Sequence, residues 1–597
     1  MGNTVALKIV IFGILVSSLG LGGCSSPTEN SATEEHANTE VEIIVETDVA
    51  VPMRDGTILR ADIYRPPGDA AFPTLVYRTP YGKHDAVELY ETHAKAVQSG
   101  YAVVIQDVRG RYASDGLFNP YRNEGRDGYD TIEWAAAQPW SNGRVGTYGL
   151  SYPGAVQWLA AVESPPHLEA MVPAMTFSHP GNFFYMNGVF DLSWLPWIYT
   201  NIAPDARVRL GLDGITDDAE AETSWAEVGA EYQAFLPLGD LPWLREEAPF
   251  YFEWLSHSPE DPWWDWADLR EQYGKVSAAV LNLSGWHDEA YGPEGAITNF
   301  SGLVAARSGE DSPRTHLVMG PWKHGVGATM SRVTGDVDFG SAAAIDYDAT
   351  LLRFFDHYLK DIDNGLGAEP PIRQFVMGAN HWQQAASWPI PGAEARKLYL
   401  AQNGRLIAEL PAVNGQQSWV ADPEHPVTDP YISFGPHDYR ELAERPDVLV
   451  FDTEPLVNDM QVTGATEAIL YVSCDCRDFD LWVKLLDVAS DGSAINLMSP
   501  GADVQRVSYR DPARGRQLIQ PGRIYEVRLT GLLTSNRFLR GHRLRAVVSA
   551  SFAPHLSRNL QTGESEITGS KAQKATITLH FGEEYPARLI VPVVPVP

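Results

Sequence analysis

The chain of 597 residues contains only three cysteines, Cys24, Cys474 and Cys476. So few cysteines exclude a framework of several disulfides, and their spacing does not match a structural zinc site. Cys474 and Cys476 lie two positions apart in a run that reads as a strand. Because a disulfide between residues i and i+2 of a strand would be strained, we expect two separate structural thiols.

Basic residues and metal-binding motifs are also scarce. Lysine and arginine number 45 against 77 aspartates and glutamates, which gives a net charge of −32. The acidic residues are scattered along the chain, and such a surface repels phosphate backbones, so we expect no nucleic-acid partner. The zinc motif H-E-x-x-H is absent, and the segment DIDNG at 361–365 lacks the later ligands of a calcium loop. We therefore expect neither a metal ion nor a cofactor.

One long apolar run occurs, at the N-terminus. It contains a single basic residue, Lys8, and ends in small residues, which is typical of a secretory signal too short to span a bilayer. The ending Leu-Gly-Gly-Cys24 resembles the lipobox of bacterial lipoproteins, which predicts a signal peptide over 1–23, lipidation of Cys24 and a polar tether over 24–42. This implies an exported protein that is lipid-anchored in the bacterial cell envelope. The alternative is an ordinary cleaved signal that happens to precede a cysteine.

Strand-like and helix-like segments alternate from about residue 42. Short β-branched runs closed by glycine or proline predict strands, and apolar residues at helical spacing predict the helices between them. The predicted strands are 41–47, 59–66, 73–80, 101–110 and 144–149, and the predicted helices are 124–138 and 152–164. Repetition of strand and helix is typical of an α/β fold with a mostly parallel sheet covered by helices.

The alternation is interrupted once and then ends. Residues 179–275 are rich in aromatic residues and proline, and we expect a helical insertion there. The strand and helix pattern returns over 276–372, so 43–178 and 276–372 form one α/β domain. After about residue 373, short strand-like runs separated by turns predict an all-β sandwich over 373–597.

Ser151 lies in the segment GLSYPG, between a predicted strand and a predicted helix. A nucleophile elbow places its serine on such a strand-to-helix turn, with small residues on both sides. Gly149 provides the first small residue, whereas the second, Gly154, comes one place later than in G-x-S-x-G. We interpret Ser151 as the nucleophile, with a loop serine as the alternative, and expect Gly154 to permit close packing of the helix.

A serine nucleophile requires a base and an acid that orients the base. In α/β-hydrolases these follow in the order Ser, Asp or Glu, His, each on a loop after a strand. Asp288 and His324 satisfy that order and placement. A turn aspartate and a loop histidine are the alternatives. His287 and His316 are less suitable bases, because His287 adjoins the presumed acid and His316 begins a strand.

The oxyanion of the tetrahedral intermediate requires hydrogen-bond donors. We expect one from the backbone N–H of Tyr152, directly after the nucleophile. A second donor should come from the loop after an earlier strand, where Tyr81 lies. Composition alone does not decide whether the Tyr81 hydroxyl is that donor.

Several motifs together resemble the cocaine-esterase and X-Pro dipeptidyl-peptidase-like hydrolases. They include GLSYPG, TPYGK, VIQDVRGRYASDG, GWHD, GPWKHG and the distal segments AILYVSCDC and DLWVKLLDV. The resemblance covers about residue 42 to the end and implies an α/β-hydrolase domain, a helical cap inserted after the elbow and a C-terminal jelly-roll domain. It also implies Ser151 as nucleophile, Asp288 as acid and His324 as base, with the Tyr81 hydroxyl and the Tyr152 amide binding the oxyanion. The late glycine is this family's normal spacing.

The resemblance predicts a serine esterase or amidase that acts on a small ester, amide or short peptide. The amino-ester branch of the family has an acidic pair soon after the triad aspartate, whereas only Glu289 is acidic here. We expect Asp107 and Arg109 to form a structural pair that supports the site, with a direct catalytic role as the alternative. Two alternatives are an exopeptidase that releases X-Pro dipeptides and a surface binding protein without catalysis. The sequence leaves the oligomeric state open.

Overall fold

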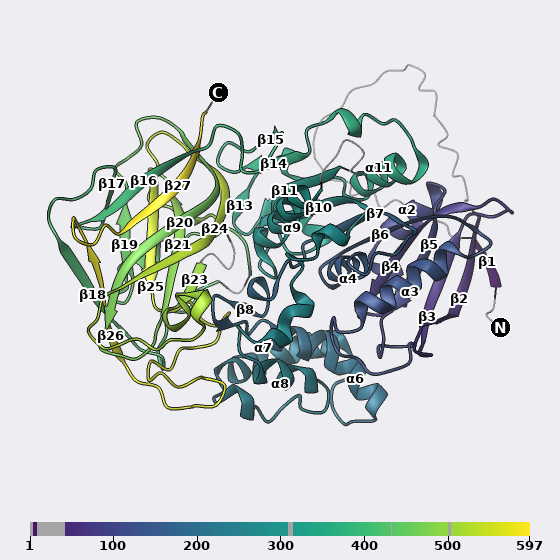
Figure 1. Ribbon diagram of the computed structural model, residues 1–597, viewed down its shortest axis with the longest axis horizontal. Helices are drawn as coiled ribbons and strands as arrows, with labels where there is room; N and C mark the ends of the chain where they lie inside the picture. The colour runs from purple at the N-terminus through teal and green to yellow at the C-terminus, as the bar shows by residue number, and fades with distance from the viewer. Residues whose placement is uncertain (1–3, 9–41, 308–313, 432, 499–502, 597) are drawn as a thin grey trace, which may run out of the picture.

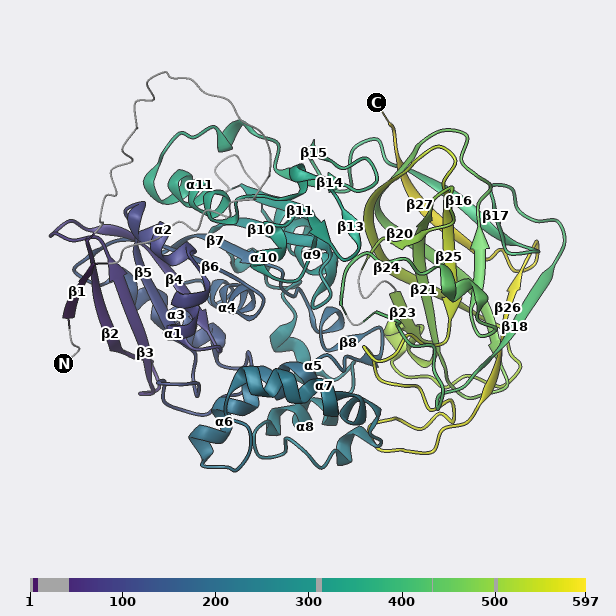
Figure 2. The same cartoon turned by 180° about the vertical axis from the view of Figure 1, so that it is seen from behind.

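The computed structural model describes residues 4–8, 42–307, 314–431, 433–498 and 503–596. These residues form an α/β part, a helical cap and a β-rich C-terminal part. Figures 1 and 2 show the C-terminal strands beside the α/β part, with the cap helices below the sheet. The three parts meet around the ends of the central strands.

The α/β part is built on one sheet. Its strands are β1 (Thr4–Lys8), β2 (Glu42–Pro52), β3 (Ile58–Arg65), β4 (Phe72–Thr79), β5 (Ala102–Asp107), β6 (Ser141–Leu150), β7 (Leu168–Ala174), β10 (Ala279–His287), β11 (Thr315–Lys323), β14 (Ile372–Val376) and β15 (His381–Ala385). Their order is β1-β2-β3-β5-β4-β6-β7-β10-β11-β14-β15. Neighbours from β5 to β14 pair in parallel, and the pairs at both edges are antiparallel. The carboxyl ends of the parallel strands therefore share one edge, where ligand sites of such sheets are found.

Helices cover both faces of this sheet. They are α1 (Lys83–Leu89), α2 (Thr92–Gln98), α3 (Glu124–Ala136), α4 (Tyr152–Ala161), α9 (Gly292–Ala306), α10 (Val326–Thr329) and α11 (Tyr347–Lys360). In α11 the apolar residues Leu351, Phe354, Phe355 and Leu359 recur at helical spacing and are all buried. The predicted alternation of strands and helices is confirmed.

The segment 179–275 forms the cap. Its helices are α5 (Trp194–Trp197), α6 (Ala203–Leu210), α7 (Asp218–Ala234) and α8 (Pro249–Ser256), and a short hairpin joins β8 (Tyr185–Met186) to β9 (Val189–Phe190). Many of its aromatic rings, including those of the buried Trp254 and Trp264, belong to a hydrophobic core that continues into the α/β part. The cap also contacts the C-terminal part, since the Leu192 N–H donates to the His555 carbonyl oxygen at 2.9 Å.

The C-terminal part is a mostly antiparallel β domain. Its strands are β16 (Glu394–Ala401), β17 (Arg405–Ile407), β18 (Gly415–Ala421), β19 (Leu449–Asp452), β20 (Met460–Cys474), β21 (Asp480–Val488), β22 (Ala494–Asn496), β23 (Asp503–Arg506), β24 (Tyr525–Phe538), β25 (Arg543–Ser549), β26 (Ala575–Phe581) and β27 (Arg588–Val594). Inward-facing residues alternate along them, as in β26, where Ile577 and Leu579 are buried. The predicted fold class, an α/β domain followed by an all-β domain, is confirmed.

The prediction of two separate thiols at Cys474 and Cys476 is wrong. The two cysteines form a disulfide, and their Cα atoms are 5.1 Å apart. The prediction assumed a strand that continues through both residues, whereas β20 ends at Cys474 and the chain bends there. The bend brings the Cα atoms within the range that disulfides span.

The predicted signal peptide and tether lie mostly outside the described residues, as does Cys24. Of the first 41 residues, only those of β1 are described, and β1 pairs with β2 at the sheet edge. In the part of the chain that the structure describes, no helix is long and apolar enough to cross a membrane.

Candidate active site

Ser151 lies on the sharp turn between β6 and α4. Its backbone has φ 71° and ψ −128°, a combination that residues with a side chain rarely adopt. Such a turn projects the side chain beyond the carboxyl edge of the sheet, as a nucleophile elbow does.

Two glycines allow the turn to form. A Cβ atom on Gly149, whose φ is 143°, would lie 2.4 Å from Pro153 Cβ. A Cβ atom on Gly154 would lie 2.6 Å from the carbonyl oxygen of Ala174, the last residue of β7. The late glycine therefore serves close packing of α4 on the neighbouring strand, as the sequence predicted.

Asp288 and His324 meet at the same edge of the sheet. Strands β10 and β11 are parallel neighbours in which His287 pairs with Lys323, so the residue after each strand lies beside the other. His324 Nδ1 is 2.8 Å from Asp288 Oδ1. Asp288 is fully buried, and its carboxylate also accepts hydrogen bonds from the Ser284 hydroxyl and the Ala290 N–H. These bonds hold the carboxylate where it can orient the imidazole.

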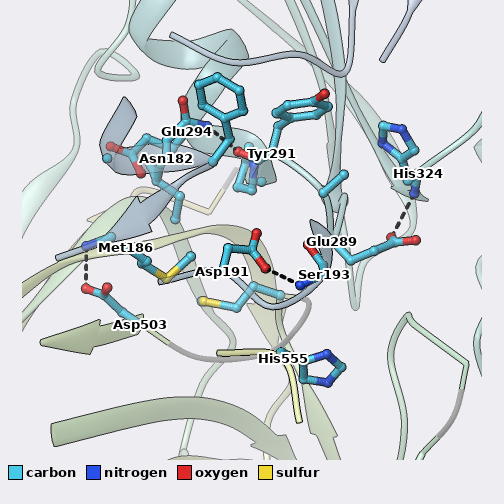
Figure 3. Close-up of a pocket in the computed structure, with 18 of the residues that line it drawn as sticks. Asn182, Met186, Asp191, Ser193, Glu289, Tyr291, Glu294, His324, Asp503 and His555 are labelled. Carbon is cyan, nitrogen blue, oxygen red and sulfur yellow. Dashed lines mark hydrogen bonds between the residues drawn. The ribbon is translucent and has the colours of Figure 1, made fainter. Parts of the chain in front are cut away.

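The charge around His324 favours its protonated form. Burial lowers the pKa of His324, but the Asp288 carboxylate, its hydrogen bond and the Glu289 carboxylate raise it further than burial lowers it. Glu289 Oε2 also accepts the backbone N–H of His324 at 2.9 Å (Figure 3). Two carboxylates thus stabilise the imidazolium that forms when the histidine accepts a proton.

Neither His287 nor His316 is placed to act as the base. His287 is fully buried, burial lowers its pKa to about 3, and neither ring nitrogen has a hydrogen-bond partner among the described residues. His316 near the start of β11 lies 3.1 Å from the Tyr358 hydroxyl. The structure therefore unites Asp288 with His324, as expected from the sequence.

Tyr81 and Tyr152 flank the serine. The Tyr81 hydroxyl interacts with the Ser151 side chain, and burial raises the pKa of Tyr81 to about 12, which keeps the phenol protonated at neutral pH. Tyr152 is the first residue of α4, so its N–H has no partner within the helix. Its side chain points elsewhere and donates to Glu124 Oε1 at 2.9 Å.

Two residues near the serine were not predicted. The Trp197 indole N–H donates to the Tyr81 hydroxyl oxygen at 3.0 Å. The Tyr291 hydroxyl interacts with the Ser151 side chain and lies 3.2 Å from the Tyr121 hydroxyl. The place of Tyr291 three residues after Asp288 could have indicated it, whereas nothing distinguishes Trp197 from the many other aromatic residues of the cap.

The predicted pairing of Asp107 with Arg109 is wrong. Asp107 accepts the Lys83 backbone N–H at 2.6 Å, and Arg109 forms ion pairs with Asp127 and Asp55. Asp107 and Arg109 do not bond to each other, because the chain turns directly after β5 and separates them. Each instead holds a neighbouring segment through the partners just named.

A cavity of about 610 Å³ lies over the serine and is walled by all three parts of the molecule (Figure 3). Ser151, His324, Tyr81 and Tyr291 line it from the α/β part. The cap contributes rings and the C-terminal part closes the far side; these residues include Phe183, Trp194, Trp197, Met498, Leu533 and His555. Its walls are therefore largely apolar near the nucleophile.

Four carboxylates line this cavity, and burial raises the pKa of each. They are Asp191, Glu289, Glu294 and Asp503. Burial raises the pKa of Asp191 and of Asp503 to about 6 and that of Glu294 to about 7. Asp191 and Asp503 also accept hydrogen bonds from neighbouring residues, as Figure 3 shows.

One group of described residues has metal-ligand spacing, namely Asp422, Glu424 and His425 in the C-terminal part. Glu424 and His425 are exposed, and Asp422 forms an ion pair with Lys574 at 2.7 Å. The group does not line the cavity over Ser151.

Comparison with known proteins assigns the family. Residues 55–326 match the model of the X-Pro dipeptidyl-peptidase (S15) family, and residues 364–590 match that of the X-Pro dipeptidyl-peptidase C-terminal non-catalytic domain. The cocaine esterase of Rhodococcus sp. (strain MB1 Bresler) is 33% identical over 592 residues, which cover 92% of this chain and 98% of that protein. The chain belongs to this family of serine hydrolases.

Solved structures agree with the assignment to the S15 family. An α-amino acid ester hydrolase is 25% identical with a TM-score of 0.79, and the match covers 95% of this chain and 100% of the other. An aminopeptidase from a marine sediment Thaumarchaeota archaeon shares the fold, with 24% identity, a TM-score of 0.79 and coverage of 96% and 99%. The chain is thus a serine hydrolase, either an esterase or an X-Pro dipeptidyl-peptidase-like enzyme.

Proposed function

We propose that the protein cleaves carboxylic ester or amide bonds through an acyl enzyme on Ser151. The observation that carries this proposal is the 2.8 Å contact between His324 and the buried Asp288, in the cavity that holds the strained Ser151. Geometry of this kind makes a serine nucleophilic, because the imidazole accepts its proton and the carboxylate orients the imidazole.

The reaction proceeds in two halves. Ser151 Oγ bonds to the substrate carbonyl carbon while its proton passes to His324 Nε2, and the carbonyl oxygen becomes an oxyanion held by the Tyr81 hydroxyl and the Tyr152 N–H. The bond to the leaving group then breaks as His324 returns the proton to it. In the second half, His324 accepts a proton from a water molecule whose oxygen bonds to the acyl carbon. The bond to Ser151 Oγ then breaks as His324 returns the proton to Ser151, and the carboxylic acid is released.

An uncharged acyl group fits the cavity over Ser151 best. The rings of Phe183, Trp194 and Trp197 provide apolar walls, and burial raises the pKa of Glu294 to about 7, so that about half of this carboxyl is uncharged at neutral pH. A dipeptidyl-peptidase must instead hold a free amino terminus in this position. We therefore favour an esterase or acylase over release of X-Pro dipeptides.

A fluorophosphonate probe and a substrate pair test the proposal. The probe should label the wild type and not Ser151→Ala; a folded wild type that stays unlabelled would favour a binding protein without catalysis. An aryl ester should then be cleaved with a higher kcat/KM than an X-Pro anilide. The reverse order would support the exopeptidase.

We also propose that the protein is exported and anchored in the bacterial envelope through lipid on Cys24. The support is the apolar N-terminal run and the Leu-Gly-Gly-Cys ending. In cells fed a labelled fatty acid, the mature protein should carry label and sediment with membranes, whereas Cys24→Ala should do neither. Label that persists in Cys24→Ala would refute the anchor.

A further inference from the structure

The hydroxyl of Tyr291 lies beside the nucleophile, and the acyl-enzyme mechanism gives it no role. Tyr291 follows Asp288 by three residues, in the loop between β10 and α9, and its hydroxyl lies near the Ser151 side chain. The residue lines the cavity over Ser151, and Asn182 Nδ2 fixes its backbone by donating to its carbonyl oxygen at 2.7 Å (Figure 3). Burial raises the pKa of Tyr291, so the phenol keeps its proton at neutral pH.

Tyr121 determines which way the Tyr291 proton points. The two hydroxyl oxygens are 3.2 Å apart, so one phenol donates to the other. Tyr121 is 2% exposed, and among the described residues its hydroxyl has no other hydrogen-bond partner. A buried proton without an acceptor is costly, so Tyr121 donates and Tyr291 accepts. The proton of Tyr291 is therefore left for a partner on the side of the cavity.

Tyr121 is itself held in place. Its ring stacks on that of Tyr152, with 4.3 Å between the ring centroids, and its backbone N–H donates to the Tyr152 hydroxyl oxygen at 3.0 Å. The φ of Tyr121 is 68°, in the left-handed region that residues with a side chain rarely adopt. Backbone strain of this kind persists where the surrounding contacts hold it, and it is common at functional sites. The donor to Tyr291 is thus fixed before any ligand binds.

Tyr291 and Tyr81 approach Ser151 from opposite sides. In the sheet, β4 lies on one side of β6, while β7 and β10 lie on the other. Tyr81 follows β4 and Tyr291 follows β10, whereas Ser151 follows β6. Since the proposed oxyanion site is on the Tyr81 side, the proton of Tyr291 faces another substituent of the tetrahedral carbon.

The cavities around the serine indicate which substituent this is. Tyr81 and His324 also line a second cavity, of about 820 Å³, whereas Tyr291 lines only the cavity over Ser151. The cavity over Ser151 is the one that fits the acyl group. Because the Tyr291 hydroxyl lies near the serine, it reaches the part of the acyl group next to the carbonyl, which is the α carbon.

A buried donor in this position discriminates between acyl groups. The rings of Phe183 and Trp194 provide apolar walls to the same cavity, so a small number of polar groups orients the ligand there. An acyl group with an acceptor at the α carbon pairs with the Tyr291 proton. An acyl group without one leaves that proton unpaired in the complex, which weakens binding in the ground state and in the transition state.

We propose that Tyr291 selects acyl groups that carry an oxygen acceptor on the α carbon, such as those of α-alkoxy, α-hydroxy and α-keto acids. This rests on the proposed function of Ser151. The Tyr291 hydroxyl donates to the α oxygen, Tyr121 holds the phenol in that orientation, and the Tyr81 hydroxyl binds the oxyanion on the other side.

Phenyl methoxyacetate and phenyl butanoate test the proposal. They have the same leaving group and acyl chains of the same length, and in the first an ether oxygen replaces one methylene group. The oxygen also makes the carbonyl more reactive in itself, so the ratio of the two kcat/KM values in the wild type is compared with that in Tyr291→Phe. The ratio should be about three- to tenfold higher in the wild type, the usual worth of one neutral hydrogen bond.

Two further tyrosine variants locate the effect. Tyr81→Phe removes the proposed oxyanion donor, so it should slow both esters and keep the wild-type ratio. Tyr471→Phe removes a hydroxyl that bonds to Glu526 away from the cavity, and it should match the wild type with both esters. Both esters are measured on one preparation, so a partly unfolded variant does not alter the ratio. Equal ratios in the wild type and Tyr291→Phe overturn the proposal, whether both rates fall together or neither changes.

Binding separates this inference from the proposed function. If the wild type cleaves neither ester, both esters are ligands, and the fluorescence of Trp194 and Trp197, which line the cavity, gives their Kd values. The ratio of Kd values should favour the methoxyacetate about three- to tenfold more in the wild type than in Tyr291→Phe. Equal Kd ratios in the two proteins would overturn the selection by Tyr291, whereas an inactive Ser151 by itself would refute only the proposed function.

Discussion

The indole N–H of Trp197 donates a hydrogen bond to the Tyr81 hydroxyl oxygen at 3.0 Å. An indole nitrogen only donates, so the phenol oxygen must accept and its own proton is left for another partner. The Tyr81 hydroxyl lies near the Ser151 side chain, and both residues line the cavity. A cap residue thus directs the Tyr81 proton toward the place where the oxyanion develops.

We first predict the effect of removing this proton. Tyr81→Phe should lower kcat on the order of a hundredfold, the usual cost of one lost oxyanion donor. KM for an aryl ester should change little, because the ring remains. An unchanged kcat would remove Tyr81 from the oxyanion site.

Trp197→Phe tests whether Trp197 acts through Tyr81. It should lower kcat by about five- to tenfold, the worth of one hydrogen bond, while an aromatic ring still covers the cavity. In a Tyr81→Phe background the same change should cost almost nothing, since there is no phenol proton to direct. Additive losses in the double variant would show that Trp197 acts on substrate packing instead.

The charges around His324 predict the pH dependence. The base must be neutral to accept the serine proton, and Asp288 and Glu289 raise its pKa above the ordinary value of 6.5. The kcat/KM of a non-ionising ester should therefore fall as pH drops through a midpoint above 6.5. A profile that stays flat down to about pH 4 would contradict the role of His324.

Glu289→Gln provides the matched control for that profile. It removes one negative charge near the imidazole and keeps an oxygen that can accept the His324 backbone N–H. The acid midpoint should move to lower pH while the activity at high pH is retained. An unmoved midpoint would leave Asp288 as the sole charge that affects the base.

The contact between Asp288 and His324 could be predicted because it depends on local order in the chain. Asp288 and His324 each follow a buried strand directly, and neighbouring parallel strands align their carboxyl ends. The Trp197 contact could not be predicted, because its partner Tyr81 is 116 positions away and the cap sequence contains many similar rings. The prediction of free thiols at Cys474 and Cys476 failed because it depended on where one strand ends.

The elbow predicts a stability effect that is separate from chemistry. In Gly154→Ala the new methyl group would approach the Ala174 carbonyl oxygen to 2.6 Å, and backbone on both sides leaves no room to yield. Thermal unfolding should show a loss of about 1–3 kcal/mol, the usual cost of overpacking. Gly274→Ala, where a Cβ atom meets nothing within 4 Å, should be close to neutral. Equal stability of the two variants would mean that α4 shifts away from β7 at little cost, and Ser151 should then lose its reactivity toward the fluorophosphonate.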